Sequence, residues 1–422
     1  MKAIIMSNNT HSAADALARL AKPVPEMGKA VYQVTSGPDE HKHAYYCFCP
    51  WSPDGRLLLL ARYNRKDPEA EICVMDTQTG KISVAGHSRD WNAHTVAFQQ
   101  WQDALNRIFY VSSDDSGLAL VTVNPDGSSP KILPADEFSS EIFCSPDGRW
   151  AYAGTSLKLL FPGDAVAPRH DKGLLRINLE TGERKTLLSI EQAAELIPRA
   201  EQAASWHLYA KRIVAHPRRP RLFCNITNTF WDRDGNEPKI RCLMTVGTDG
   251  SNPVYVGGIV HHPNWHPCED RIVANLTDFN GVMRFGLYRG DGRGLVEYVP
   301  AARGSGHPSY SPDGRWLCTD AAGPRGNRMI LCDPATGREI LLMECDTAGE
   351  SGYASFKSID RRAKGETVMD ALRRVEEGAV KVWQTQCHPA WSRDGSAILF
   401  NMDRGQGSQL FMVDVKRALE GT

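Results

Sequence analysis

The segment "GSGHPSYSPDGRWLCTD", Gly304 to Asp320, has the pattern of two short β-strands joined by a tight turn. In its Ser-Pro-Asp-Gly core, proline presets one backbone angle and glycine accepts a left-handed one. The aspartate of such a turn accepts hydrogen bonds from its own turn amides, so we assign it a structural role. His307 lies four residues before the turn begins, where turn chemistry does not call for a histidine.

The same turn recurs along the chain, as "WSPDGR" from Trp51, "CSPDGRW" from Cys144 and "WSRDGS" from Trp391. Divergent copies are "FQQWQDALNRIFYV" from Phe98, "AHPRRPRLFC" from Ala215 and "WHPCEDRIVAN" from Trp265. A short alternating apolar run, typical of a strand, follows each copy. The turn starts are residues 52, 99, 145, 216, 266, 311 and 392. Seven units of roughly 45 residues predict an all-β, seven-bladed β-propeller with four-stranded blades.

The two ends of the chain are predicted to meet in one blade. The last unit ends with "QLFMVDV" and lacks a fourth strand, whereas "KAVYQVTSG", residues 29–37, is a strand without a blade. Pairing the two would close the ring and remove its free edges. We therefore expect one propeller domain over residues 29–422, preceded by an extension of residues 1–28.

Two unusually long spacings between turns predict insertions, at about residues 156–172 and 344–383. The second contains "SIDRRAKGETVMDALRRVEEGAV", which has helical periodicity. Insertions of this kind usually cover one face of a propeller.

Composition excludes several classes of function. The chain of 422 residues has 49 basic and 50 acidic residues and a net charge of -1, so nothing attracts nucleic acid or an anionic membrane. No apolar stretch approaches the roughly 20 residues needed to cross a bilayer. Eleven scattered cysteines argue against a disulfide framework and favour a reducing compartment, most simply the cytoplasm. Cys47 and Cys49 are expected on one face of a strand, as packing residues.

Histidines recur at one position of the repeat. His307, His388 and His262 each lie four residues before the turn start of their own unit. The segment before the turn is the innermost strand of a blade, which lines the central channel, so the three side chains are expected to converge. A single such histidine would more simply be a core or surface residue. Three in register favour a metal site or a base that works near neutral pH.

Further candidates lie near these histidines. Gln384 and Gln386, beside His388, could add an amide oxygen to a metal site. Arg241, on the strand before the His262 blade, could pair with a substrate carboxylate. Weaker candidates are His207, Tyr209 and Arg212 on the inner strand of the fourth blade, His94 in the second, and His266 at a turn position. A solvated or packed role is as good an interpretation for each of these.

The sequence resembles the propeller polysaccharide lyases, specifically the oligogalacturonate lyase family and the related ulvan-type and rhamnose–glucuronate lyases. The resemblance runs from about Lys29 to Val415. The segments that carry it are "HAYYCFCPWSPDGRLLL", "LLRINLETGERKTLL", "HHPNWHP", "GSGHPSYSPDGRWLCTD" and "QCHPAWSRDGSAILF". The turns also occur in TolB-like propellers, so the histidines distinguish the two groups.

The resemblance implies a manganese ion bound in the channel by histidines and a glutamine, with a histidine base and a nearby arginine. On this basis His307 matches a metal ligand, and His388 matches the second histidine of the family's His-Pro-His motif. Gln386 replaces the first histidine of that motif. His262 matches the base, and Arg241 lies near the assisting arginine with a small offset.

The chain also departs from the family pattern. The family's Asn-His pair on the fourth blade is replaced by Lys211-Arg212. The changed ligand set leaves the metal open among Mn²⁺, Ca²⁺ and Zn²⁺. The changed fourth blade suggests a substrate other than oligogalacturonate.

We therefore expect a lyase that cleaves a uronate-containing oligosaccharide by β-elimination. His262 would be the base, a metal or Arg241 would neutralise the carboxylate, and water, His207 or Tyr209 would protonate the leaving group. The alternative is a non-catalytic, TolB-like binding propeller. A sugar isomerase or hydrolase ranks last, because hydrolysis usually needs paired carboxylates.

Overall fold

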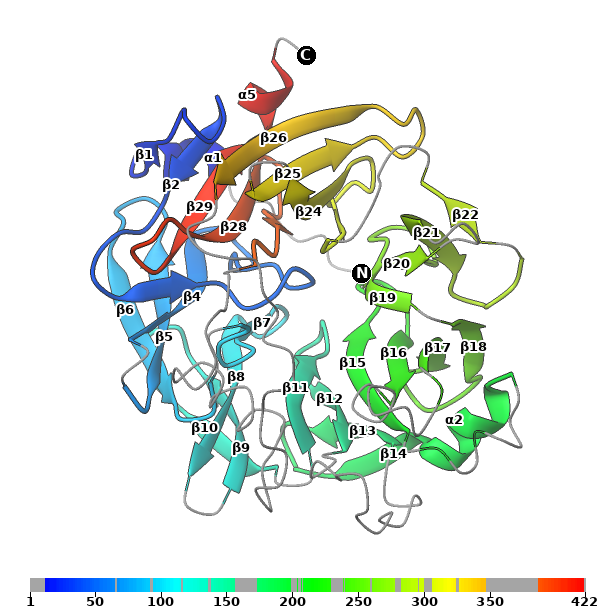
Figure 1. Ribbon diagram of the computed structural model, residues 1–422. Coiled ribbons are helices and arrows are strands. Elements are labelled where there is room, and N and C mark those ends of the chain that lie inside the picture. The colour runs from blue at the N-terminus through cyan, green and yellow to red at the C-terminus, as the bar shows by residue number, and fades with distance from the viewer. Residues whose placement is uncertain are drawn as a thin grey trace.

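The β-strands form seven antiparallel sheets around a central channel (Figure 1), so the predicted seven-bladed β-propeller is confirmed. Six sheets have four strands and the seventh has five. The computed structural model describes residues 12–422 except 65–66, 92–93, 115–116, 136–137, 156–172, 199–202, 204–205, 207, 229–237, 239, 259, 278–281, 295, 300–305, 324–325, 347–385 and 421–422. Both predicted insertions lie largely or wholly outside the described residues, as do His207 and Gln384.

Each blade runs in chain order from its innermost strand outward. The first blade consists of β3 (Glu40–Lys42), β4 (Leu57–Tyr63), β5 (Ala70–Asp76) and β6 (Ile82–Ser88). The second consists of β7 (Gln100–Gln102), β8 (Arg107–Asp114), β9 (Gly117–Val123) and β10 (Lys131–Pro134). The third consists of β11 (Phe138–Cys144), β12 (Trp150–Thr155), β13 (Gly173–Asn178) and β14 (Arg184–Ser189). The fourth blade consists of β15 (Tyr209–Ala215), β16 (Arg221–Thr227), β17 (Arg241–Gly247) and β18 (Val254–Gly257). The fifth consists of β19 (Val260–Trp265), β20 (Arg271–Thr277), β21 (Met283–Arg289) and β22 (Glu297–Tyr298). The sixth consists of β23 (Ser309–Tyr310), β24 (Leu317–Gly323), β25 (Gly326–Cys332) and β26 (Glu339–Asp346).

The seventh blade joins the two ends of the chain. Its strands are β27 (Ala390–Trp391), β28 (Ala397–Asp403) and β29 (Ser408–Asp414), followed outward by β2 (Val31–Gln33) and β1 (Lys22–Pro23). Val31 of β2 lies opposite Val413 of β29, so the predicted closure of the ring by an N-terminal strand is confirmed.

The residues before β2 take part in the propeller. Helix α1 (Ala13–Ala18) buries Ala14 and Leu17, which pack in one cluster with Met412 of β29. The segment that the sequence assigned to an extension therefore contributes a helix and a fifth strand to the last blade. The other helices among the described residues are α2 (Ile190–Leu196) and α5 (Val415–Leu419).

The turn aspartates have the predicted structural role. Each accepts a hydrogen bond at 3.0–3.1 Å from the amide two residues further on, and these four are Asp54, Asp147, Asp313 and Asp394. Tryptophans before the turns also tie neighbouring blades together, because their indole Nε1 donates to a carbonyl of the preceding blade's inner segment. These pairs are Trp101 with Pro50, Trp265 with Val214 and Trp391 with Ser309, at 2.9, 3.0 and 2.9 Å.

The predicted turn start at residue 99 is wrong by three residues. Strand β7 ends at Gln102 and the turn follows it, so Gln102 corresponds to Ser52 of the first blade. The divergent copy lacks the Ser-Pro-Asp-Gly core, and "FQQWQ" gave no other marker of its register.

Residues 43–50, which we call the channel loop, leave the first blade and enter the channel. After β3 the chain rejoins the blade at Pro50 and Trp51: the carbonyl of Pro50 accepts from the amide of Leu59, and Trp51 forms an isolated bridge to Leu58. Tyr46 donates its hydroxyl to the carbonyl of Pro263 on β19, at 3.0 Å, so the loop reaches across to the fifth blade. The expectation of Cys47 and Cys49 on a strand is therefore wrong, because placement in the channel overrides the β-propensity of the sequence.

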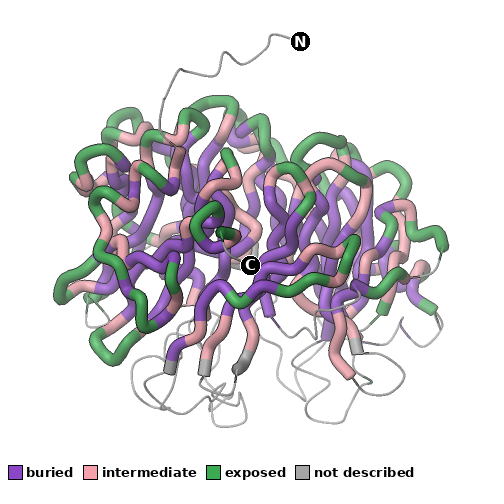
Figure 2. Tube along the Cα trace, turned by 90° about the horizontal axis from the view of Figure 1, so that it is seen from above, coloured by how far each residue is buried: buried purple, intermediate pink, exposed green. Residues whose placement is uncertain are grey.

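The strands fill the interior and the turns face solvent (Figure 2). Among the helices of the described ranges, none has the length and apolar composition needed to span a membrane.

The closing strand gives a first prediction. Val31 is 2% exposed and packs among side chains of the last two blades, including Phe411. Val31→Ala should lower the free energy of unfolding by about 2 kcal/mol, because it removes buried methyl groups. Urea unfolding followed by tryptophan fluorescence measures this change. Lys22→Ala, at an exposed position of β1, is the control, and an equal effect of both variants would contradict the role of β2.

Candidate functional site

Two inner strands carry irregularities that redirect their side chains. The pairing of β19 with β20 shifts between His261 and Asn264, and the intervening His262 has a φ of 47°. The pairing of β15 with β16 shifts between Lys211 and Val214, where Arg212 has a φ of 55°. A β-bulge turns a side chain away from the regular alternation of a strand.

The left-handed backbone recurs at one register position. His262 and Arg212 both lie four residues before their turn starts, and so does His388, which has a φ of 48° just before β27. Non-glycine residues pay on the order of 1–3 kcal/mol for such strain, which is concentrated at functional sites. Phe98, four residues before Gln102 in the second blade, has a φ of 50° as well. Four blades therefore share this conformation, and three of them place an imidazole or a guanidinium there.

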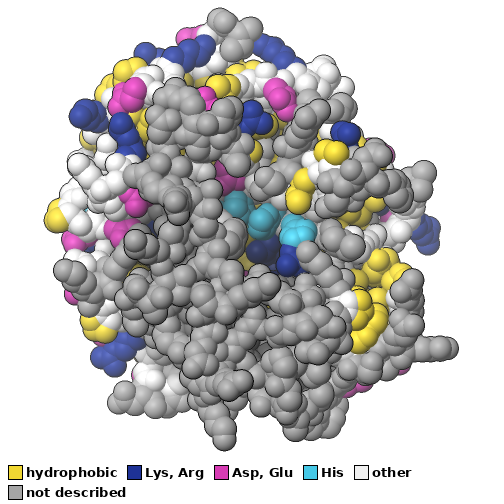
Figure 3. Space-filling view, viewed as in Figure 1, with side chains coloured by type: hydrophobic (Ala, Val, Ile, Leu, Met, Phe, Trp, Pro, Cys, Tyr) yellow, Lys and Arg dark blue, Asp and Glu magenta, His cyan; other side chains and the backbone are white. Residues whose placement is uncertain are grey.

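The structure brings four histidines together in the channel. The ring centroids of His262 and His307 are 4.3 Å apart, and those of His307 and His388 are 4.4 Å apart. His94 of the second blade lies 4.9 Å from His388. Figure 3 shows histidine side chains beside cationic ones at the central opening of this face. We call these four residues the histidine cluster.

Tyrosines of the channel loop pack against the cluster. The ring centroids of Tyr45 and His388 are 4.6 Å apart, and those of Tyr46 and His307 are 5.0 Å apart. Both tyrosines are buried. Sequence reasoning missed them, although "HAYYCFCP" contains two adjacent aromatic residues directly after a strand that is too short to pair with all of β4.

Asp320 on β24 orients two of the histidines, and sequence reasoning missed it too. Its carboxylate accepts from the backbone amide of His307 at 2.6 Å, lies 3.0 Å from Nδ1 of that ring with both oxygens, and accepts from the backbone amide of His388 at 3.3 Å. Burial alone would raise the pKa of Asp320, but the charge and hydrogen bonds of His307 outweigh it and the pKa is lowered. The only available signal was a carboxylate within the apolar run "WLCTDAAG".

Three imidazoles of the cluster are held in the neutral form. The pKa values of His94, His262 and His388 lie well below the ordinary value, first because of burial and then because of neighbouring positive charge. The amide nitrogen of Asn275 donates to the carbonyl of Gly306 at 2.7 Å and lies 3.2 Å from Nδ1 of His262. Because an amide N–H can donate only to an unprotonated ring nitrogen, this contact also favours neutral His262.

Two of the other candidates, Arg241 and Gln386, lie beside histidines of the channel. Arg241 begins β17, and its Nη1 lies 2.6 and 2.9 Å from the two ring nitrogens of His261, beside His262. Oε1 of Gln386 lies 3.1 Å from Nε2 of His388. Tyr209 is buried at the start of β15.

His266 does not join the histidine cluster. Its Nδ1 accepts from the amides of Cys268 and Glu269 in its own turn, at 3.2 and 3.0 Å. Nε2 lies 3.3 Å from the carbonyl of Gly314 in the next blade. The imidazole thus replaces the usual serine and aspartate of the turn.

The fit of a divalent metal can be tested on the available ligand atoms. Nε2 of His307 and Nδ1 of His388 are buried and have no hydrogen-bond partner among the described residues. Asp320 behind His307 is the arrangement that commonly orients a metal-binding imidazole. Within the described ranges, however, no three His, Cys, Asp or Glu side chains converge closely enough to hold an ion. The chemistry of these two nitrogens therefore fits a divalent cation. For Gln386 to serve as a third ligand, its amide oxygen would have to turn away from Nε2 of His388, where it now lies.

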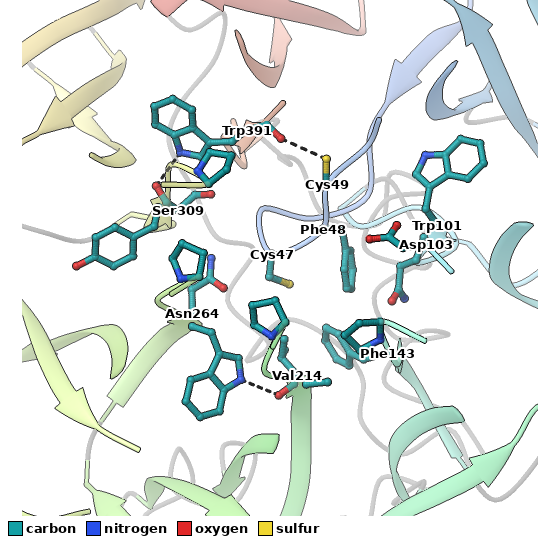
Figure 4. Close-up of a pocket in the computed structure, with 18 of the residues that line it drawn as sticks. Cys47, Phe48, Cys49, Trp101, Asp103, Phe143, Val214, Asn264, Ser309 and Trp391 are labelled. Carbon is teal, nitrogen blue, oxygen red and sulfur yellow. Dashed lines mark hydrogen bonds between the residues drawn. The ribbon is translucent and has the colours of Figure 1, made fainter. Parts of the chain in front are cut away.

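A cavity of about 440 Å³ lies on the other side of the channel loop. Figure 4 shows Cys47, Phe48 and Cys49 of that loop beside this cavity, and turn segments of several blades also line it. No member of the histidine cluster lines this cavity. We therefore place the chemistry at the histidine cluster and not in the cavity.

Two solved structures with the same architecture are oligogalacturonate lyases. One, from Vibrio parahaemolyticus, superposes with a TM-score of 0.63 at 14% identity, covering 91% of this chain and 93% of that chain. The other, an oligogalacturonate lyase in complex with manganese, superposes with a TM-score of 0.65 at 14% identity, covering 93% and 95%. TolB from Acinetobacter baumannii is a more distant neighbour, with a TM-score of 0.43 at 14% identity over 70% of this chain and 65% of that chain.

These likenesses establish a fold similar to that of oligogalacturonate lyases, and at this identity they show the fold alone. They give no support to the ulvan-type and rhamnose–glucuronate part of the resemblance. No protein-family model and no curated protein matches the sequence.

Proposed function

We propose that this protein is a lyase that cleaves a uronate-containing oligosaccharide by β-elimination in the central channel. The observation that carries the proposal is the convergence of His94, His262, His307 and His388 beside Arg212. Neutral imidazoles can move a proton, and a fixed cation can stabilise the negative charge that develops on the substrate. The likeness to oligogalacturonate lyases supports the same reaction class.

The reaction has three requirements. The base takes the proton from C5, the electrons form the C4–C5 double bond, and the C4–O bond breaks. The leaving oxygen then receives a proton. The C5 proton is only weakly acidic, so a positive charge must neutralise the adjacent carboxylate as the enolate-like intermediate forms.

His262 is the proposed base. Its neutral imidazole lies in the channel between the rings of His307 and His261. His261 in turn contacts Arg241. Taking a proton at Nδ1 requires the ring to give up its contact with Asn275. At 3.2 Å this is the longer of the two contacts of that amide, and catalytic hydrogen bonds often rearrange when substrate binds. Tyr209 is the remaining described candidate for protonating the leaving oxygen.

A divalent metal, when bound by His307 and His388 with an amide oxygen of Gln386 or Gln384, would supply further stabilisation of the carboxylate. Manganese is the first candidate, because one similar structure is a manganese complex. Imidazole also suits zinc, and an amide oxygen also suits calcium. Titrating the protein with each of the three ions would therefore identify the one that it binds.

Elimination can be measured directly, because the unsaturated uronate product absorbs in the ultraviolet. The protein is incubated with pectic, ulvan-type and rhamnose–glucuronate oligosaccharides, with chelator or with added manganese, and with a neutral galactan as the control. A rise in absorbance on an acidic substrate alone is the expected result. A flat trace on every substrate with folded protein would contradict the proposal and favour a non-catalytic binding propeller.

The metal part of the proposal predicts that His307→Ala weakens Mn²⁺ binding at least about tenfold. Loss of residues that merely support a ligand already costs about 10- to 100-fold, and this variant removes the ligand itself. Isothermal titration calorimetry with MnCl₂ gives the affinity without any assay of activity. His87→Ala, an exposed histidine on β6, is the control. Equal affinity in His307→Ala and wild-type protein, or no Mn²⁺ binding by wild-type protein, would contradict the metal assignment.

A further inference from the structure

Among the described residues, Arg212 is a channel cation without an ion pair. Its guanidinium lies 5.4 Å from the centre of the Tyr45 ring, and the side chain is half-buried. In the described part of the chain it forms no hydrogen bond and no ion pair, although a guanidinium carries five N–H donors. Burying such a group without compensation is unfavourable, so its retention here calls for a ligand.

None of the described carboxylates forms an ion pair with Arg212. Asp320 is committed to His307 and to the backbone of His388. Glu141, at the equivalent position of the third blade, influences Arg212 electrostatically but forms no ion pair with it among the described residues. Among the described residues, no carboxylate therefore forms a direct ion pair with the Arg212 guanidinium.

Backbone geometry points this cation at the same space as the histidines. Arg212 shares with His262 and His388 the register position four residues before the turn, together with the left-handed φ. Arg212 and His262 also share a bulge in their inner strands. The fourth blade thus places a guanidinium where the neighbouring fifth blade places an imidazole.

Arg241, the arginine that the sequence favoured, is engaged elsewhere. Its Nη1 lies against the His261 ring, at 2.6 and 2.9 Å from the two nitrogens. A bidentate pair with a carboxylate needs two N–H groups on one side of the guanidinium, which favours Arg212 for that contact.

We propose that Arg212 is the residue that recognises the substrate, by a bidentate ion pair with the carboxylate of an acidic sugar. This inference rests on the proposed function, because it assumes an acidic sugar in the channel. It places the carboxylate contact on a side chain of the protein, so recognition does not depend on a bound metal.

The test compares binding of D-galacturonate and its methyl ester, which differ in the charge of the carboxyl group. Titration calorimetry is performed in EDTA on wild-type protein, Arg212→Asn and Arg212→Lys. Asparagine tolerates the left-handed backbone, so this variant removes the charge with little added strain. The control is Arg219→Asn, at an exposed turn position.

Wild-type protein should prefer galacturonate to its ester at least about tenfold, the usual value of a hydrogen-bonded ion pair. Arg212→Asn should lose that preference, and Arg212→Lys should keep part of it because lysine retains the charge without the planar fork. The inference would be overturned if a folded Arg212→Asn variant preferred galacturonate to its ester as strongly as wild-type protein does. It would also be overturned if wild-type protein showed no such preference.

The same proteins distinguish this inference from the proposed function. If galacturonate binding depends on Arg212 but no oligosaccharide is eliminated, the inference stands and the lyase proposal fails. If elimination occurs and Arg212→Asn leaves both KM and kcat unchanged, the lyase proposal stands and Arg212 is not the recognition residue.

Discussion

Replacing His262 with alanine should lower kcat for elimination about 100- to 10,000-fold, the usual contribution of a positioned general base. The pKa of His262 is held well below its ordinary value, first by burial and then by neighbouring positive charge. The imidazole is therefore neutral at pH 7 and able to accept a proton. Ultraviolet absorbance of the product gives kcat, and circular dichroism verifies the fold. His87→Ala, at an exposed site on β6, is the control and should keep the wild-type rate.

His307 is the competitor for the role of base. Asp320 contacts its Nδ1, and its Nε2 has no hydrogen-bond partner among the described residues. His262→Gln separates the two assignments, because glutamine keeps a hydrogen-bond donor but cannot take up a proton at neutral pH. As great a loss in His262→Gln as in His262→Ala supports His262 as the base. A His262→Gln variant with more than about a tenth of the wild-type rate would transfer proton abstraction to His307.

The architecture could be predicted because its signals are local. The Ser-Pro-Asp-Gly turn encodes its own hairpin through side-chain contacts within five residues, such as those of Asp313 with the amide of Arg315. Because that hairpin recurs along the chain, the sequence predicted a ring of blades. The prediction failed at residue 99, where the local markers are absent, and at the channel loop, where a strand-like sequence is held in the channel by contacts with distant blades.

Three of the four members of the histidine cluster were predictable for the same reason. A fixed distance of four residues from a turn places His262, His307 and His388 at equivalent points of their blades, so their convergence follows from the repeat. Distance from a turn said nothing about the bulge at Arg212, which determines where its side chain points. It also said nothing about the pairing of Arg241 with His261, because these residues lie in different blades.

Asp320 was beyond sequence reasoning because its partners come from two blades. Within its own strand it is a single acidic residue in an apolar run, and the histidine amides that it accepts from lie 13 and 68 positions away along the chain. The carboxylate thereby joins the sixth and seventh blades beneath the histidine cluster. Stability and geometry of the site consequently depend on one side chain.

Asp320→Ala should lower the free energy of unfolding by about 3–5 kcal/mol, because several buried donors lose their acceptor at roughly 1–3 kcal/mol each. The variant leaves two backbone amides and Nδ1 of His307 without their acceptor in a site where Asp320 itself is 7% exposed. Urea unfolding monitored by tryptophan fluorescence measures the loss. Asp126→Ala is the control, because that aspartate accepts only within an exposed turn and should cost about 1 kcal/mol or less.

Asp320→Asn distinguishes the charge from the hydrogen bonds. Asparagine keeps one acceptor oxygen of similar shape, so it should retain part of the stability lost in Asp320→Ala. It carries no negative charge to orient Nδ1 of His307, so the elimination rate should fall as well. A loss below about 1 kcal/mol in Asp320→Ala would mean that the amides of His307 and His388 find other partners. In that case Asp320 would not be the group that holds the two histidine blades in register.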